Sequence, residues 1–273
     1  MSRWGLAAGA LAGLAARAAQ AAPLPEARYG LPRDASVDGH HVDSLLHFTL
    51  GSTAIIFAVV LTLLLWAVLK HRGAAHPAAY DHGSRRSRRV VVGSLAAIAV
   101  VVDGSLFTLT ELDLHRHFWN FDGVDADPRV VRIEVNAHQW SWAVRYPGPD
   151  GRFGTPDDIV ATDEIRVPVG APVLMQLTST DVIHSLYLPN FRVKQDAVPG
   201  NVGRLTFEAK VPGEYEIGCA QHCGPNHYKM RGVLTVLAPD AYREWLATAS
   251  ADAGRAYDPD DADAHWGWEW RRF

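Results

Sequence analysis

The stretch 218–232 concentrates side chains that bind soft metal ions. It reads Gly-Cys-Ala-Gln-His-Cys-Gly-Pro-Asn-His-Tyr-Lys-Met-Arg-Gly and holds both cysteines of the chain. Thiolate and thioether sulfur are soft ligands and imidazole suits copper, whereas calcium and magnesium take oxygen and zinc seldom takes methionine. The glycines of the stretch let the backbone turn sharply around an ion. The sequence therefore predicts a copper site built on Cys219, Cys223, His227 and Met230.

Two other interpretations of this stretch stay open at the level of residues. Cys219 and Cys223 could form a small structural disulfide in an oxidising compartment, with Met230 filling a gap in the core. A disulfide, however, requires neither His227 nor Met230 at this spacing. Thiol-exchange and copper-delivery proteins also use paired cysteines, but they usually alternate strands and helices as thioredoxin does, and this sequence does not show that alternation.

Two long apolar runs in the first half of the chain predict a pair of membrane-spanning helices. Residues 45–69 carry no charged side chain and residues 90–110 carry only Asp103, and a bilayer core needs about 20 apolar residues in a helix. The loop 70–89 between them has six basic residues against one acid, so it is expected on the cytoplasmic side. A carboxyl inside a span is costly, which makes Asp103 a candidate for a proton path or for pairing with a partner subunit, with snorkelling or an interhelical hydrogen bond as the plain alternative.

After about residue 127 the pattern changes to the alternation of apolar and polar residues that is typical of strands. Trp140 and Trp142 are expected to project from one face of a strand, where core packing is the plain interpretation. The copper ligands lie on a loop between two expected strands, which would hold them rigidly between redox states. Strands are expected at 129–135, 164–169, 173–178, 205–207, 213–217 and 233–237, with a turn-rich insertion at 147–159 and a short amphipathic helix at 239–250.

The motif Cys-x-x-x-Cys-x-x-x-His-x-x-Met, preceded by Asp-Val-Ile-His-Ser at 181–185, resembles the dinuclear copper (CuA) domain of the cytochrome c oxidase subunit II family. Most of that family has Glu where this chain has Gln221, and the Glu carboxylate helps to hold a magnesium ion at the contact with subunit I. Gln221 keeps the backbone carbonyl and lacks the charge. The six ligands that the resemblance implies are Cys219 and Cys223, which bridge both coppers, His184 and Met230 on one copper, and His227 and the Gln221 carbonyl on the other.

Two further segments resemble parts of the same family. Residues 138–142, His-Gln-Trp-Ser-Trp, are similar to an aromatic segment whose first Trp receives the electron from cytochrome c, which places that role on Trp140, with Ser141 in place of the usual Tyr. Residues 192–200 are similar to a Lys-x-Asp-Ala-x-Pro-Gly segment whose Asp faces subunit I near the magnesium, which places Asp196 behind the copper ligands. The residues alone favour core packing for Trp140, and only the resemblance gives it a role in electron transfer.

These patterns together predict a fold in two parts: an N-terminal two-helix transmembrane hairpin and an all-β cupredoxin-like domain, a Greek-key sandwich or barrel. The Leu- and Ala-rich start of the chain, with Ala19-Gln20-Ala21 before Pro23, has the layout of a signal peptide. The expected segments are a signal peptide (1–22), a periplasmic segment (23–44), two spans (45–69 and 90–110) around a basic cytoplasmic loop (70–89), a linker (111–126), the periplasmic copper domain (127–250) and an acidic, then Trp-rich tail (251–273).

The function that the resemblance implies is electron input to a respiratory haem-copper oxidase of the bacterial inner membrane. The chain would accept electrons from cytochrome c or a small copper protein and pass them to haem in subunit I, which with the other oxidase subunits reduces oxygen and pumps protons. A net charge of -4 over 273 residues argues against nucleic-acid binding, and without a Cys-x-x-Cys-His motif no c-type haem is expected. The alternatives are a nitric oxide reductase subunit with the same copper centre, or a membrane-anchored copper-binding or delivery module that is not an enzyme.

Overall fold

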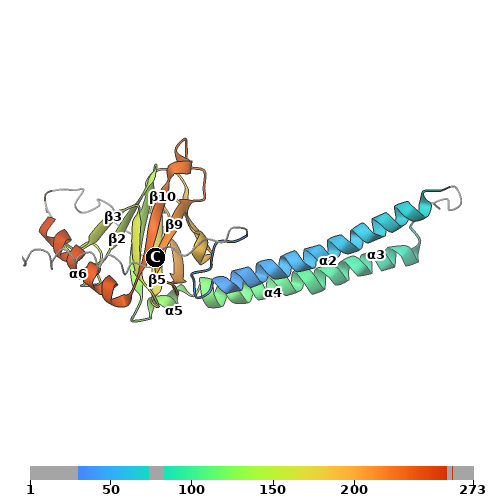
Figure 1. Cartoon of the computed structure of the whole chain (residues 1–273), viewed down its shortest axis with the longest axis horizontal. Helices are drawn as coiled ribbons and strands as arrows, with labels where there is room; N and C mark the ends of the chain where they lie inside the picture. The colour runs from blue at the N-terminus through green and yellow to red at the C-terminus, as the bar shows by residue number, and fades with distance from the viewer. Residues whose placement is uncertain (1–29, 74–82, 257–259, 261–273) are drawn as a thin grey trace, which may run out of the picture. The chain divides into compact units, whose positions relative to one another are not determined.

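The structure, a computed structural model, describes residues 30–73, 83–256 and 260. The expected signal peptide and most of the Trp-rich tail lie outside the described residues. The chain divides into two compact units (Figure 1). Of the described residues, 40–73 and 83–117 form the hairpin unit, and 30–39, 118–256 and 260 belong to the β unit.

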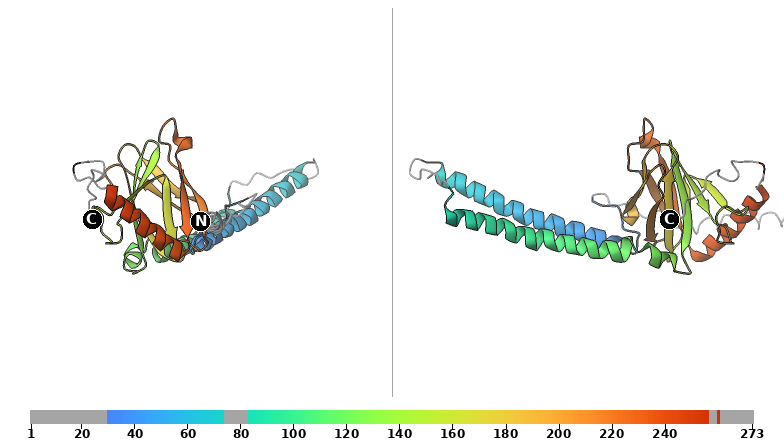
Figure 2. Two further views of the ribbon diagram at one scale, coloured as in Figure 1. Left: turned by 60° about the vertical axis from the view of Figure 1, so that its left-hand side comes forward. Right: turned by 180° about the vertical axis from the view of Figure 1, so that it is seen from behind.

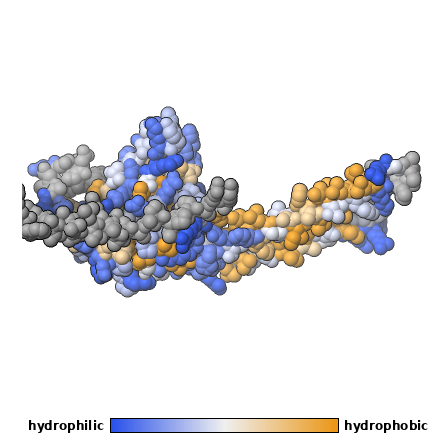
Figure 3. Space-filling view, in the orientation of Figure 1, coloured by the Kyte–Doolittle hydropathy of each residue, from blue (hydrophilic) through white to orange (hydrophobic). Residues whose placement is uncertain are grey.

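The hairpin unit consists of two long helices that run side by side (Figures 1 and 3). Helix α2 (Gly39–His71) is unbroken. The return helix comprises α3 (Arg85–Ile98), a π-helical turn (Ala99–Asp103), α4 (Gly104–Asp113) and a second π-helical turn (Leu114–Phe118). Both helices are long and apolar enough to cross a membrane, and their apolar side chains face outward along the hairpin (Figure 3). They contain the two spans that the sequence predicts.

The β unit is a sandwich of two five-stranded sheets (Figure 2), which confirms the expected all-β domain. One sheet has the order β3-β2-β1-β5-β8 and the other the order β4-β10-β9-β6-β7. Neighbours are antiparallel except for β1 with β5 and β4 with β10. The strands are β1 (Val131–His138), β2 (Ser141–Tyr146), β3 (Ile159–Thr162), β4 (Glu164–Pro168), β5 (Pro172–Ser179), β6 (His184–Leu188), β7 (Val193–Ala197), β8 (Gly203–Glu208), β9 (Gly213–Cys219) and β10 (Arg231–Leu237).

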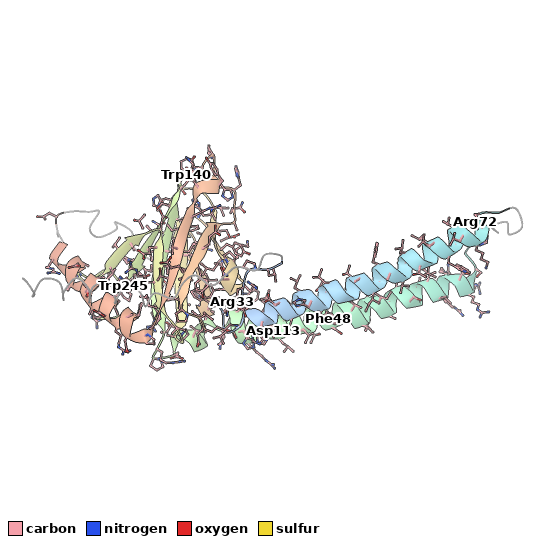
Figure 4. The ribbon with its side chains drawn as sticks, in the orientation of Figure 1. Arg33, Phe48, Arg72, Asp113, Trp140 and Trp245 are labelled. Carbon is pink, nitrogen blue, oxygen red and sulfur yellow. The ribbon has the colours of Figure 1, made fainter. Side chains whose placement is uncertain are left out.

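The core lies between the two sheets because alternate residues of each strand are apolar. Val135 of β1, Trp142 of β2 and Leu186 of β6 are among the residues with no exposed surface. Helix α6 (Pro239–Ala256) packs on this sandwich through Trp245, labelled in Figure 4, whose ring meets Tyr146 edge-on with 5.1 Å between centroids. A short helix, α5 (Phe121–Asp125), precedes β1.

Trp140 does not share a strand with Trp142, and the sequence prediction was wrong on this point. Strand β1 ends at His138 and β2 begins at Ser141, so Gln139 and Trp140 form the two-residue turn between them. Trp142 is fully buried and Trp140 is half-buried. The prediction failed because Gln and Trp carry none of the Gly, Asn or Asp signals that usually mark such a turn.

A strap formed by residues 33–37 is bound along the β unit. The amide of Ala35 donates to the Asn190 carbonyl at 2.8 Å, the amide of Val37 donates to the Glu208 carbonyl at 2.9 Å, and the Ala35 carbonyl accepts from the Lys210 amide at 2.9 Å. Ala35 is only 1% exposed, so the strap is part of the core. Because the chain leaves the β unit before α2 and rejoins it after the return helix, a hairpin that crosses a membrane has both ends on the same face.

Candidate metal centre

The candidate ligands are held by three neighbouring strands of one sheet. Cys219 is the last residue of β9, and Met230 immediately precedes β10, which pairs with β9. The Cys219 amide donates to the Met230 carbonyl at 3.2 Å, which closes the base of the loop. His184 is the first residue of β6, which pairs with β9 on its other side. The Ala220 amide donates to the Ser185 carbonyl at 2.9 Å and ties the loop to β6.

All six ligands implied by the sequence lie together. The Nδ1 atom of His184 is 3.1 Å from the Met230 sulfur and 4.0 Å from the Cys219 sulfur. The Cys223 sulfur is 3.8 Å from the Cys219 sulfur, 3.4 Å from His227 Nδ1 and 3.8 Å from the Met230 sulfur. The backbone carbonyl of Gln221 lies 3.2 Å from the Cys219 sulfur. Two thiols, a thioether, two imidazole nitrogens and one carbonyl oxygen therefore converge, a donor set that suits copper.

Asp181 fixes the orientation of His184. Its Oδ1 atom lies 2.8 Å from His184 Nε2, which leaves Nδ1 directed at the sulfur atoms. Burial works against the charge of Asp181, but hydrogen bonds from His184 and from the amides of Val182 and Gln139 outweigh it and lower the pKa of this carboxyl. A carboxylate behind a histidine in this way is the usual arrangement at metal sites. Sequence analysis missed Asp181, although its place three residues before His184 in the quoted motif was available as a signal.

The two thiols are free. Their sulfur atoms are 3.8 Å apart, whereas a disulfide bond measures about 2.05 Å. Burial first, and then the neighbouring Cys219, raise the pKa of Cys223 to about 11. Two thiolates at this distance repel each other, so a bound cation is the natural means of keeping both ionised.

In the metal-free chain, the free energy of unfolding is expected to fall as the pH rises from about 9 to about 11. The folded chain keeps a proton on Cys223 that the unfolded chain releases, so this stabilisation is complete below pH 9 and is lost as the pH passes the raised pKa. Denaturant unfolding of the full chain in detergent, followed by tryptophan fluorescence, measures this loss. Cys223→Ser lacks the group and serves as the control; the same slope in both proteins would contradict the assignment.

Trp140 contacts the ligand loop directly. Its Nε1 donates to the Cys223 carbonyl at 3.2 Å, and Gln139 Nε2 donates to the same oxygen at 2.7 Å. Gly224 has φ of +119°, and a Cβ there would lie 2.8 Å from Gln139 Nε2 and 3.3 Å from the Trp140 ring. The close approach of this turn to the loop therefore requires glycine. Trp140 lies at the end of the β unit that carries the ligand loop (Figure 4).

Asp196 lies on β7 and reaches the ligand loop through one intermediate residue. Its Oδ1 accepts from the Ser185 hydroxyl at 2.7 Å and lies 3.4 Å from Lys194 Nζ. Ser185 in turn holds Ala220 of the loop. Within the described residues, Asp196 belongs to no group of three metal-ligating side chains, so a magnesium ion at this position finds no support in this chain.

Comparisons with known proteins identify the family that this chain resembles. Residues 131–237 match a family model described as cytochrome c oxidase subunit II, periplasmic domain. The chain is 30% identical over 240 residues to cytochrome c oxidase subunit 2 of Cereibacter sphaeroides, covering 77% of this chain and 75% of the relative. It is 29% identical over 239 residues to alternative cytochrome c oxidase subunit 2 of Bradyrhizobium diazoefficiens, covering 78% and 82%.

A solved structure is also similar to part of the chain. The crystal structure of the periplasmic domain of subunit II of cytochrome oxidase (CoxB) of Bradyrhizobium japonicum is 30% identical in sequence, with a TM-score of 0.40. The similarity covers 45% of this chain and 94% of that domain.

Proposed function

Because this chain belongs to the cytochrome c oxidase subunit II family, we propose that it is the electron-input subunit of a respiratory haem-copper oxidase. Its relatives are subunits of cytochrome c oxidase, an oxidoreductase. The observation that carries the proposal is the convergence of two free thiols, two histidines and a methionine at one end of the β unit. The proposed ligands of the two coppers (CuA) are His184, Cys219, the Gln221 carbonyl, Cys223, His227 and Met230.

The chain's own contribution is to present these donors in fixed positions. A bound copper pair would supply a one-electron redox centre. The strands β6, β9 and β10 hold the base of the loop by backbone hydrogen bonds, and Asp181 holds the ring of His184. Donors that are already in place need little rearrangement when the charge of the site changes, which favours fast electron transfer. The fully buried Met230 and the nearly buried Cys223 keep water away from the sulfur atoms.

We propose that electrons enter the chain at Trp140. Its indole is half-buried and donates a hydrogen bond to the Cys223 carbonyl, so a donor that touches Trp140 would be one hydrogen bond and a few covalent bonds from a ligand sulfur. The donor would be a cytochrome c or a small copper protein. On the opposite side of the loop, the contact from Asp196 through Ser185 supports a role for Asp196 at the interface with subunit I.

The apolar helices support anchoring in the bacterial inner membrane, with residues 45–69 and 90–110 as the spans and the basic loop 70–89 in the cytoplasm. The β unit, including the proposed copper domain 127–250, would then face the periplasm, since the strap and the residues after the return helix belong to the same unit. Subunit I and other oxidase subunits would surround the hairpin.

Copper analysis and electron paramagnetic resonance on the full chain in detergent test the proposal. We expect two coppers per chain and a spectrum in which one unpaired electron is shared by two copper nuclei. One copper per chain with a single-nucleus spectrum, in a chain that does not copurify with haem, would contradict the proposal and support a copper-delivery module. Copurification with a subunit that reduces nitric oxide but not oxygen would instead identify a nitric oxide reductase.

A further inference from the structure

Three histidines gather where helix α2 begins and the return helix ends, and none of them belongs to the proposed copper centre. The rings of His40 and His41 are 4.1 Å apart between centroids, and the rings of His41 and His117 are stacked at the same distance. All three lie in the hairpin unit, whereas the ligand loop lies in the β unit. We call this group the histidine cluster.

Asp113 gives the cluster the arrangement of a metal site. Its Oδ1 lies 3.4 Å from His41 Nδ1, so the Nε2 atom of His41 is the nitrogen available to an ion. At metal sites, a carboxylate commonly accepts from one ring nitrogen while the other binds the ion. Asp113 is the last residue of α4 and lies beside the first turns of α2 (Figure 4). The carbonyl end of the return helix adds negative charge that favours a cation.

Helix capping alone does not account for this grouping. A histidine in the last turn of the return helix, such as His117, is ordinary, because it can interact with the free carbonyls there. His40 and His41 are in the first turn of α2, where the positive end of the helix dipole gives a basic side chain no advantage. His41 and His117 have ring nitrogens within 4.8 Å of each other, so both can donate nitrogen to one ion across the two helices.

We propose that His41 and His117, each of which offers a ring nitrogen within 4.8 Å of the other's, bind a divalent transition-metal ion, with Asp113 positioning His41. Imidazole donors together with a carboxylate suit Zn²⁺ or Cu²⁺ rather than Mg²⁺ or Ca²⁺. Such an ion would join the first turn of α2 to the last turns of the return helix. The cluster holds no sulfur ligand, so it differs in chemistry from the ligand loop.

Zinc titration of the full chain tests the proposal. Zn²⁺ is titrated into the metal-free full chain in competition with a chelating indicator, and the ligand loop, which is the same in every variant, contributes equally to the uptake. We expect the wild type to bind one equivalent that the double variant His41→Asn/His117→Asn loses. Asp113→Asn, which keeps all three imidazoles, is expected to weaken this equivalent by about 10- to 100-fold.

His115→Asn is the matched control, because His115 lies in the same turn but faces Glu111 at 3.4 Å. It should bind zinc as the wild type does. Equal zinc uptake by the wild type, the double variant and Asp113→Asn would overturn the proposal. Unchanged helix content by circular dichroism distinguishes a lost ligand from a misfolded hairpin. If the double variant misfolds, the zinc affinity of Asp113→Asn alone tests the proposal. All variants keep the same ligand loop, so the comparison stands whether or not that loop binds two coppers.

Discussion

Replacing Cys223 by serine is expected to reduce the copper content of the full chain from two ions to fewer than one and to remove the shared-electron spectrum. Cys223 contacts three other donors of the centre, since its sulfur lies within 4 Å of Cys219, His227 and Met230. Serine offers a harder oxygen that stays protonated at neutral pH, so it does not replace a bridging thiolate. Metal analysis and electron paramagnetic resonance measure the effect.

Gln221→Ala provides the matched control for this prediction. The proposed ligand at that position is the backbone carbonyl, which lies 3.2 Å from the Cys219 sulfur, and alanine retains it. The variant should therefore keep both coppers. If Cys223→Ser retained two coppers, or if Gln221→Ala lost them as fully as Cys223→Ser, the assigned ligand set would be wrong.

Replacing Trp142 by alanine is expected to lower the free energy of unfolding by about 3–5 kcal/mol. Trp142 has no exposed surface and its ring packs edge-on against His184, with 6.1 Å between centroids. The cavity would also free the ring of His184 to move, so copper affinity should fall together with stability. Denaturant unfolding with and without copper, followed by circular dichroism, measures both effects.

Two further substitutions, Trp142→Phe and Trp140→Ala, serve as controls for the Trp142→Ala prediction. Trp142 Nε1 has no hydrogen-bond partner within the described part of the chain. Trp142→Phe therefore removes an unsatisfied group and leaves a smaller void than alanine does. It should lower the free energy of unfolding much less than Trp142→Ala. Trp140→Ala removes a half-buried ring in a turn, so it should lower the free energy of unfolding by less than Trp142→Ala does. A loss below about 1 kcal/mol for Trp142→Ala would show that the core closes around the missing ring.

The sequence predicted most of the strands and brought the ligands together, because both rest on local signals. Strands such as β1 alternate apolar and polar residues, and the motif spacing places Cys219, Cys223, His227 and Met230 on one loop. Strands β3, β6 and β7 were missed, and β3 is only four residues long and follows a turn-rich insertion. The turn at Gln139 and Trp140 was missed because it contains none of the Gly, Asn or Asp residues that usually mark a turn.

Other features were not predictable because they depend on contacts between distant residues. The motif placed Asp181 near His184, but the direction in which their hydrogen bond turns the His184 ring depends on where the distant sulfur atoms lie. The histidine cluster joins His41, at the start of the first helix, to His117, at the end of the return helix, which are far apart in the sequence. The strap has no apolar alternation of its own, and its burial follows from the backbone groups of Asn190, Glu208 and Lys210.

The strap also constrains the order in which the chain can fold. The carbonyl of Arg33 accepts from Asn190 across 157 residues, and Asp34 pairs with Lys210 across 176. The strap is synthesised before its partners: Asn190 follows both long helices and six strands, and Lys210 follows eight strands. Contacts this far apart in sequence form slowly. Docking of the strap therefore belongs to the last steps of folding, when it closes a loop of chain that contains the whole hairpin.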